Sequence, residues 1–225
     1  MFGAALERAV QYADLLAGPG LERGLLGPRE VARLWDRHLL NCAALAELVP
    51  RQASVVDVGS GAGLPGVILA MLLPDARIVL LEPMARRAAF LEECVRVLGL
   101  SNAVTCRRRA EDAAGELVAD VATARAVAPL DRLAGLTIPL VRPGGVVLAL
   151  KGASAGREVE QARLALQKAG VQEVTVIRAG VGRIRPPAIV VRMTAGRRSA
   201  DASRQRHGTD KRARVGETAG RQRSR

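Results

Sequence analysis

The chain has 225 residues, 49% of them hydrophobic and 2% aromatic, and a formal net charge of +12. This length and apolar content suit one domain with extensions and a full core built from Leu, Val and Ala. The cysteines, Cys42, Cys94 and Cys106, lie far apart without C-x-x-C spacing, which argues against a zinc site and against a disulfide framework. We therefore expect no metal and a reducing, cytoplasmic location.

The sequence also lacks the signals of export and of membrane insertion. Residues 1–8 contain no basic stretch followed by a long apolar core, and no uninterrupted apolar run is long enough to span a bilayer. We expect no membrane partner.

Positive charge is concentrated near the C-terminus. Residues 197–225 hold ten basic and three acidic residues, a net of +7, so the preceding residues carry the remaining +5. A basic body with a basic tail suits a polyanionic partner such as RNA. It equally suits a solubilising surface on an arginine-rich protein, and charge alone leaves both interpretations open.

Two helices are predicted before the first strand. Residues 1–17 have apolar positions at helical spacing, and Gly18-Pro19-Gly20 should end that helix. A second helix should run from Pro28 to about Leu48, because proline suits a first helical turn and apolar residues line one face. We expect the pair to pack on the sheet or to shape an entrance to the site.

Strands and helices alternate from residue 53 onward. The predicted strands cover residues 54–58, 77–81, 103–107, 118–123 and 146–150. The predicted helices cover residues 67–73, 86–98, 130–141 and 158–169. This alternation is typical of parallel βαβ units. Two further strands, 173–177 and 188–193, have no helix between them, so they should pair antiparallel at the sheet edge.

Composition divides the chain into three parts. Residues 1–50 should form a helical extension packed on the core, and residues 51–195 should form the α/β domain. Residues 196–225 are basic and contain Val215 as their only large aliphatic side chain, so we expect a disordered tail.

The most informative stretch is V-V-D-V-G-S-G-A-G-L-P-G, residues 55–66. A β-branched strand leads into closely spaced glycines and then into a helical pattern, which presents backbone N–H groups to a nucleotide-like ligand. Glycine is needed there for close approach or for positive φ. Residues 61–66 match the G-x-G-x-x-G dinucleotide fingerprint, which is a weak signal when it stands alone.

Two acids near this loop narrow the choice of ligand. Asp57 precedes the glycines, giving D-x-G-x-G-x-G, the order of the S-adenosylmethionine loop in class I methyltransferases. Its carboxylate can accept loop N–H groups or face the amino group of the ligand, whereas it would repel a pyrophosphate. Glu82 ends the next strand, where an acid can bind two ribose hydroxyls of either ligand class.

Further motifs follow in a fixed order: L-L-E-P-M-A-R-R-A-A-F-L (80–91), R-R-A-E (108–111), A-R-A-V-A (124–128) and L-K-G (150–152). With the glycine loop they resemble the RsmG/GidB family, bacterial 16S rRNA guanine-N7 methyltransferases, over roughly residues 5–193. The upstream W-D-R-H-L-L-N-C (35–42) resembles the Arg-His helix of that family, with Asn41-Cys42 where many members have Asp-Ser.

The resemblance implies a class I, Rossmann-like α/β fold. Its sheet would have seven strands, mostly parallel, with an antiparallel final hairpin and a short N-terminal helical extension. The implied activity is methylation of N7 of a specific guanine in 16S rRNA, with S-adenosyl-L-methionine as the cofactor. The implied partner is the 30S subunit or its assembly intermediate, and the oligomeric state stays open.

The resemblance also implies a set of cofactor-binding residues. Gly59 and Leu64 would line the methionine and ribose side, and Glu82 would bind the ribose hydroxyls. Arg125 would close the site near the reacting sulfonium. The full implied set is Gly59, Gly61, Leu64, Glu82, Ala110, Glu111 and Arg125, in which Ala110 and Glu111 flank the adenine.

Methylation at guanine N7 requires no general base. The neutral base already has a lone pair on N7, so positioning and desolvation suffice. The sequence has no N-P-P-Y-type motif and no Pro-Cys pair, and neither His38 nor His207 belongs to a catalytic constellation. We therefore expect no catalytic residue.

The candidates for binding the RNA substrate are Arg37, His38, Arg86, Arg87 and Lys151. Arg86 and Arg87 open a helix, where the dipole disfavours cations, so we expect them to bind phosphate. Lys151 ends the fifth strand on the ligand side, where it can position substrate. Each of these residues could instead be an ordinary solvated side chain.

Two other functions remain open from the residues alone. The G-x-G-x-x-G match would suit an NAD(P)-dependent oxidoreductase, which would bind NADH and not S-adenosylmethionine. An RNA-binding or assembly protein with a vestigial cofactor pocket would bind RNA without transferring a methyl group.

Overall fold

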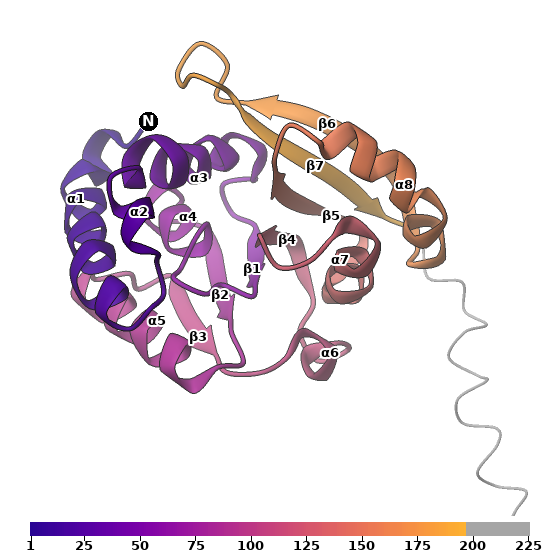
Figure 1. Cartoon of the computed structure of the whole chain (residues 1–225). Helices are drawn as coiled ribbons and strands as arrows, with labels where there is room; N and C mark the ends of the chain where they lie inside the picture. Colours follow the sequence, from indigo (N-terminus) through magenta and orange to yellow (C-terminus); the bar gives the residue numbers. More distant parts are fainter. Residues whose placement is uncertain (197–225) are drawn as a thin grey trace, which may run out of the picture.

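The computed structural model describes residues 1–196, which form a sheet with the strand order β3-β2-β1-β4-β5-β7-β6 (Figure 1). Its strands are β1 (Ser54–Val58), β2 (Arg77–Leu81), β3 (Ala103–Cys106), β4 (Ala119–Arg125), β5 (Val141–Lys151), β6 (Val171–Ala179) and β7 (Ala188–Ala195). Strands β1 to β5 pair in parallel, whereas β7 is antiparallel to both β5 and β6. The predicted mostly parallel sheet with an antiparallel final hairpin is confirmed.

Helices cover both faces of the sheet (Figure 1). One face carries α1 (Leu6–Leu15), α2 (Pro28–Val31), α3 (Leu40–Leu45), α4 (Gly66–Leu72) and α5 (Ala85–Val97). The other face carries α6 (Ala110–Ala113), α7 (Leu130–Thr137) and α8 (Ala155–Lys168). Because successive strand residues point to opposite faces, Val55 packs in the first core and Val56 in the second. Burial on both sides explains the nearly continuous apolar run of β1.

The predicted ends of β1 and β2 match the structure, whereas other boundaries differ. The predicted helix 130–141 is too long, because α7 ends at Thr137 and a 3-10 turn, η5 (Ile138–Leu140), leads into β5. Strand β5 begins at Val141, ahead of its predicted start, because Val141 already pairs with Ala119. The short helix α6 was not predicted.

Both predicted N-terminal helices differ from the observed ones. Gly18-Pro19-Gly20 does not end the first helix, since a π-helical turn, η2 (Leu16–Gly20), continues it. Packing explains this, because Leu16 is fully buried and a Cβ on Gly20 would lie 3.4 Å from Phe90 Cζ. The second predicted helix is broken into α2, a π-helical segment η3 (Leu34–Leu39), α3 and a 3-10 turn η4 (Ala46–Leu48). The wide turn of η3 buries His38 together with Leu39.

The N-terminal helices share one hydrophobic core with α4 and α5. Tyr12, Leu16 and Leu45 are buried in the same cluster as Leu69 and Phe90. The division into a helical extension, residues 1–50, and an α/β domain, residues 51–195, stays a prediction. Nearly all of the predicted tail, 197–225, lies outside the described residues. Within residues 1–196, no helix combines the length and apolar character that crossing a bilayer requires.

A buried carboxylate joins β1 to its neighbours on the ligand side. Asp57, only 1% exposed, accepts hydrogen bonds from the backbone N–H of Gly66 (3.0 Å) and from the Thr123 hydroxyl (2.9 Å). It thereby ties β1 to the start of α4 and to β4. Burial raises the pKa of Asp57 to about 6, while its hydrogen bonds oppose that rise.

The raised pKa of Asp57 predicts a specific dependence of stability on pH. Folding favours the protonated acid, so its contribution is present below about pH 4 and is lost as the pH rises through about 6. Asp57→Asn removes this titration. The wild-type protein should therefore lose about 2 kcal/mol of unfolding free energy relative to the variant between pH 4 and pH 7. Denaturant unfolding of both proteins across this range measures the difference.

Asp120→Asn is the matched control. Arg142 and Ser54 lower the pKa of Asp120 to about 2, so its contribution is lost only as the pH falls below about 4. Between pH 4 and pH 7 the difference between wild type and Asp120→Asn should stay flat. A flat difference for Asp57→Asn as well would contradict the raised pKa.

Candidate active site

The glycine loop between β1 and α4 has the geometry of a ligand cradle. Gly59, Gly61 and Gly63 have positive φ angles of 66°, 59° and 96°. A Cβ on Gly63 would lie 2.6 Å from Val67 and 2.7 Å from the Tyr12 hydroxyl, so that position accepts only glycine. The same hydroxyl of Tyr12 donates to the Ala62 carbonyl (2.6 Å), which fixes the loop from helix α1.

Glu82 holds the loop from the other side. Its Oε2 accepts from the Gly61 N–H (3.0 Å) and its Oε1 accepts from the Met84 N–H (3.0 Å). Each carboxylate oxygen has a second lone pair, so two acceptor positions remain. Glu82 is 2% exposed, and the guanidinium of Arg87 lies 3.9 Å from Oε2. A ligand can reach this carboxylate only if its surroundings move, and Arg87 is the more exposed of the two side chains.

A cavity of about 230 Å³ lies against the loop. We name it the loop cavity; it is lined by Leu25, Leu26, His38, Gly59, Ser60, Gly61, Ala62, Leu64, Arg87, Arg125 and Ala126. It therefore brings together four of the predicted cofactor residues and two of the predicted RNA-binding residues.

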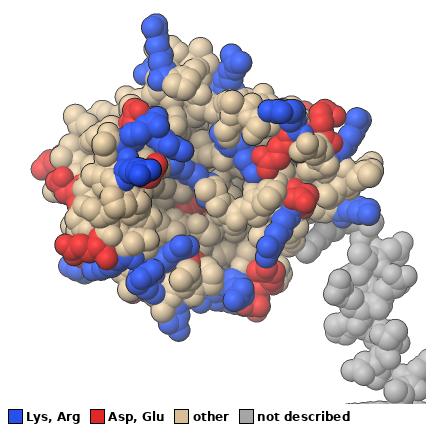
Figure 2. Space-filling model, viewed as in Figure 1, with Lys and Arg blue, Asp and Glu red and all other residues tan. Residues whose placement is uncertain are grey.

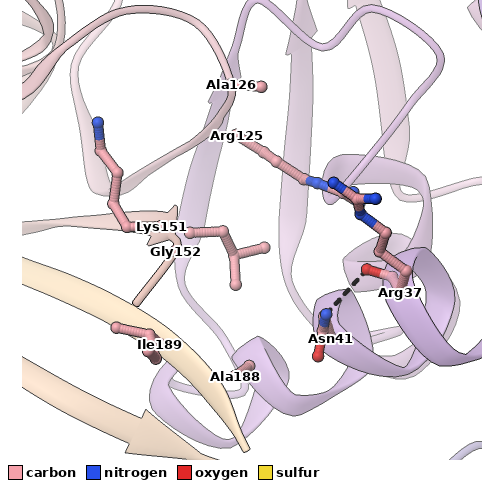
Figure 3. A pocket seen from close by; sticks show the side chains of 9 residues that line it. Arg37, Asn41, Arg125, Ala126, Lys151, Gly152, Ala188 and Ile189 are labelled. Carbon is pink, nitrogen blue, oxygen red and sulfur yellow. Dashed lines mark hydrogen bonds between the residues drawn. The ribbon is translucent and has the colours of Figure 1, made fainter. Parts of the chain in front are cut away.

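A second cavity, of about 420 Å³, lies beside the carboxyl end of β5. We name it the outer cavity; it is lined by Arg37, Asn41, Arg125, Ala126, Leu150, Lys151, Gly152, Ala188 and Ile189 (Figure 3). The molecule is hollowed near the centre of the face shown in Figure 2, with Lys and Arg side chains around the hollow and acidic ones among them.

The two cavities meet at Arg125 and Ala126, which line both. Ala126 has a φ of +54°, a left-handed conformation that residues with a Cβ rarely adopt. Strained backbone of this kind occurs at ligand sites, where the surrounding structure holds it in place. Arg125 and Ala126 therefore mark the boundary between the two cavities.

The guanidinium of Arg125 is held by two side chains of the N-terminal helices. It donates to Nδ1 of His38 and to the thiol of Cys42 (3.5 Å). Burial, followed by the nearby Arg125 charge, lowers the pKa of His38 and favours the neutral imidazole. Burial raises the pKa of the Cys42 thiol to about 11, so it too is uncharged. Both partners therefore leave the positive charge of Arg125 uncompensated.

Lys151 lines the outer cavity, but its ammonium points away from Arg37 and Arg125 (Figure 3). It donates to the Ala128 carbonyl (3.0 Å) and pairs with Glu158 (2.6 Å), which also accepts from the Leu130 N–H. In this structure Lys151 therefore anchors the segment after β4, and contact with substrate stays a prediction.

Other predicted site residues lie outside both cavities. Arg86 is exposed on the first turn of α5, Ala110 is buried at the start of α6, and Glu111 is exposed beside it. These residues follow β2 and β3, so they share the carboxyl edge of the sheet with the glycine loop. Their predicted contacts with adenine and with phosphate remain untested.

Sequence reasoning missed several residues that shape the site. Tyr12 carried a weak signal as the only tyrosine of the chain. Glu30 reads as an ordinary first-turn acid after Pro28, although the structure places it 2.6 Å from His38. Nothing in the sequence marks Ala126, because alanine gives no indication of a positive φ.

Comparisons with known proteins identify the family to which the chain belongs. The family model GidB, described as rRNA small subunit methyltransferase G, matches residues 5–184. The chain is 54% identical over 194 residues to the ribosomal RNA small subunit methyltransferase G of Thermobifida fusca, covering 86% of this chain and 82% of that protein. It is 53% identical over 197 residues to that of Streptomyces coelicolor, covering 87% and 82%.

Solved structures with lower identity share the fold. A SAM-dependent O-methyltransferase from Thermotoga maritima aligns with a TM-score of 0.56 at 16% identity, covering 76% of this chain and 71% of that one. Aeropyrum pernix fibrillarin, in complex with natively bound S-adenosyl-L-methionine, aligns with a TM-score of 0.53 at 19% identity, covering 71% and 76%. The fold is thus that of the Rossmann-like S-adenosylmethionine-dependent methyltransferases, and the chain belongs to the rRNA small subunit methyltransferase G family.

Proposed function

We propose that this protein transfers a methyl group from S-adenosyl-L-methionine to N7 of a specific guanine in 16S rRNA, in the cytoplasm and on the 30S subunit or its assembly intermediate. Membership of the family supports the RNA substrate. The two adjoining cavities support a reaction between a bound cofactor and a base.

The loop cavity would hold the methionine and ribose part of the cofactor once the surroundings of Glu82 move. The positive-φ glycines leave room for close approach to the backbone, and Glu82 keeps two acceptor positions for the ribose hydroxyls. Leu64 would pack beside the methionine and ribose, and Ala110 and Glu111 would flank the adenine. When bound, the cofactor supplies an electrophilic methyl group on a sulfonium.

Arg125 and Arg87 are the guanidinium groups that line the loop cavity. Arg87 lies at the ribose end, beside Glu82. Arg125 lies at the boundary with the outer cavity, where its uncompensated charge suits the carboxylate of the methionine part. Pairing with that carboxylate would also offset the repulsion between Arg125 and the sulfonium.

The lining of the outer cavity supports methylation at N7, which membership of the family suggests. Among its described lining residues are no carboxylate and no imidazole, and the Lys151 ammonium is engaged by Glu158. Such a cavity offers no group to remove a proton from an amine or a hydroxyl. Guanine N7 needs none, because its lone pair is free in the neutral base. Leu150, Ala188 and Ile189 provide apolar surface for the flat ring.

The chain then has to align and shield the reacting atoms. The base would lie with N7 toward the Ala126 boundary, in line with the sulfur–methyl bond. The glycine loop and Arg125 would hold the methyl donor and the outer cavity would hold the base, so that the methyl group could pass from sulfur to N7 without release of a proton. Arg37 at the rim of the outer cavity, and Arg86 and Arg87 near the loop, would bind phosphates of the RNA.

Neither alternative explains the site as well. An NAD(P)-dependent oxidoreductase is disfavoured by membership of the methyltransferase family. A pocket retained without catalysis is disfavoured by the intact contacts of Asp57, Glu82 and Arg125.

Purified protein given 30S subunits and methyl-labelled S-adenosylmethionine should label one guanine as 7-methylguanosine. Mass spectrometry of nuclease fragments of the 16S rRNA identifies the base and its modified atom. Labelling of an exocyclic amine, a ribose hydroxyl or a pyrimidine would contradict the proposal. RNA binding without any transfer would favour the non-catalytic alternative.

Glu82→Gln tests the cofactor site separately from catalysis. The amide cannot accept the loop N–H bonds and both ribose hydroxyls as the carboxylate can, so S-adenosylhomocysteine should bind at least tenfold more weakly. Calorimetry measures the dissociation constant, with Glu93→Gln as the control, since Glu93 pairs with Arg23 and lines neither cavity. Equal affinities of the two variants for S-adenosylhomocysteine would show that Glu82 does not bind the cofactor. Tight binding of NADH would instead support the oxidoreductase alternative.

A further inference from the structure

Arg37 and Arg125 point toward one another across the inner wall of the outer cavity (Figure 3). Like charges that face one another repel unless an anion lies near them. Within residues 1–196, no carboxylate lies within ion-pair distance of Arg125, whose hydrogen-bond partners are the uncharged His38 and Cys42. A carboxylate of these residues can therefore act on Arg125 only through another side chain.

Glu30 contacts Arg37 directly and is connected to Arg125 through His38. Its Oε2 accepts a hydrogen bond from Nε2 of His38 (2.6 Å), and its Oε1 lies 3.4 Å from the guanidinium of Arg37. His38 has a side chain only 9% exposed, and its Nδ1 accepts from Arg125. Glu30, His38 and Arg125 thus form a continuous chain from helix α2 to the end of β4.

The break in the N-terminal helix makes this chain possible. Glu30 and His38 are eight positions apart, and a straight α-helix would separate them by about 12 Å along its axis. The turn after α2 and the π-helical segment η3 bring them into contact instead. Irregular helical turns of this kind are frequent at functional sites.

We propose that Glu30 is a positioning residue: acting through His38, it fixes the guanidinium of Arg125 at the boundary between the loop cavity and the outer cavity. This inference rests on the proposed function, in which Arg125 binds the cofactor. Glu30 itself lines neither cavity, so it is not a catalytic residue.

The chemistry of the imidazole explains how Glu30 acts at a distance. A carboxylate at Nε2 requires the proton on that nitrogen, which leaves the lone pair of Nδ1 free to accept from Arg125. Without the carboxylate, the imidazole can carry its proton on Nδ1 instead, and that N–H would face the guanidinium. Arg125 would then lose its acceptor and move away from the boundary.

Glu30→Ala removes the acceptor, and Glu30→Gln keeps an acceptor of nearly the same size without the charge. We expect S-adenosylhomocysteine to bind at least tenfold more weakly to Glu30→Ala, with Glu30→Gln intermediate, as measured by calorimetry. Asp36→Asn is the matched control, because Asp36 pairs with Arg33 in the same segment and does not contact His38. Its affinity should stay within twofold of wild type.

A double-mutant cycle separates positioning from a general loss of structure. If Glu30 acts through Arg125, then Glu30→Ala should weaken binding less than threefold in an Arg125→Ala background. An equal loss in both backgrounds would overturn the inference, and so would unchanged affinity in both Glu30 variants. Thermal unfolding of every variant checks the fold, and Glu30→Gln serves as the test if Glu30→Ala does not fold.

The wild-type protein distinguishes this inference from the proposed function. If the wild-type protein binds S-adenosylhomocysteine but labels no guanine of the 30S subunit, the proposed methyl transfer is contradicted. The double-mutant cycle of Glu30 and Arg125 can still be measured in that case. Wild type that labels guanine, together with Glu30 variants that match Asp36→Asn, would contradict only the positioning by Glu30.

Discussion

The rest of the site depends on how the glycine loop after β1 is held. Its glycines adopt positive φ angles without strain but keep the largest backbone freedom of any residue, so contacts from outside the loop are needed to fix it. Asp57 accepts the Gly66 N–H, Glu82 accepts the Gly61 N–H, and the Tyr12 hydroxyl donates to the Ala62 carbonyl. These groups come from β1, from the end of β2 and from α1, so sheet and N-terminal helices jointly shape one loop.

The N-terminal helices contribute to both sides of the reaction. They supply His38 to the loop cavity, and Arg37 and Asn41 to the outer cavity. Methyltransferases under 20% identical to this chain share its sheet, and a common sheet by itself does not determine the methyl acceptor. In our proposal the sheet presents the cofactor, and the helical segments before it help to define the acceptor.

The sequence was sufficient to predict those parts of the structure whose local pattern is compatible with only one kind of element. The apolar runs of residues 54–58 and 77–81 predicted the bounds of β1 and β2. The position of Asp57 ahead of the glycines indicated that its carboxylate would accept N–H groups of the loop. Glu82 could be placed because residues after parallel strands meet at one edge of the sheet.

Features set by tertiary packing could not be predicted in the same way. The regular apolar spacing of residues 28–48 predicted one straight helix, whereas burial of His38 and Leu39 breaks it and creates the contact with Glu30. The sequence placed Lys151 at the ligand edge, but its partner Glu158 lies on the following helix, and no local pattern indicates that pairing. The left-handed conformation of Ala126 has no counterpart in the sequence, because alanine rarely adopts a positive φ.

The most direct test of the account is a crystal structure of the protein with S-adenosylhomocysteine. The account predicts ribose hydroxyls hydrogen-bonded to Glu82, the carboxylate of the ligand paired with Arg125, and the sulfur at the Ala126 boundary facing the outer cavity. A ligand whose sulfur faces away from that cavity, or whose ribose does not contact Glu82, would contradict it.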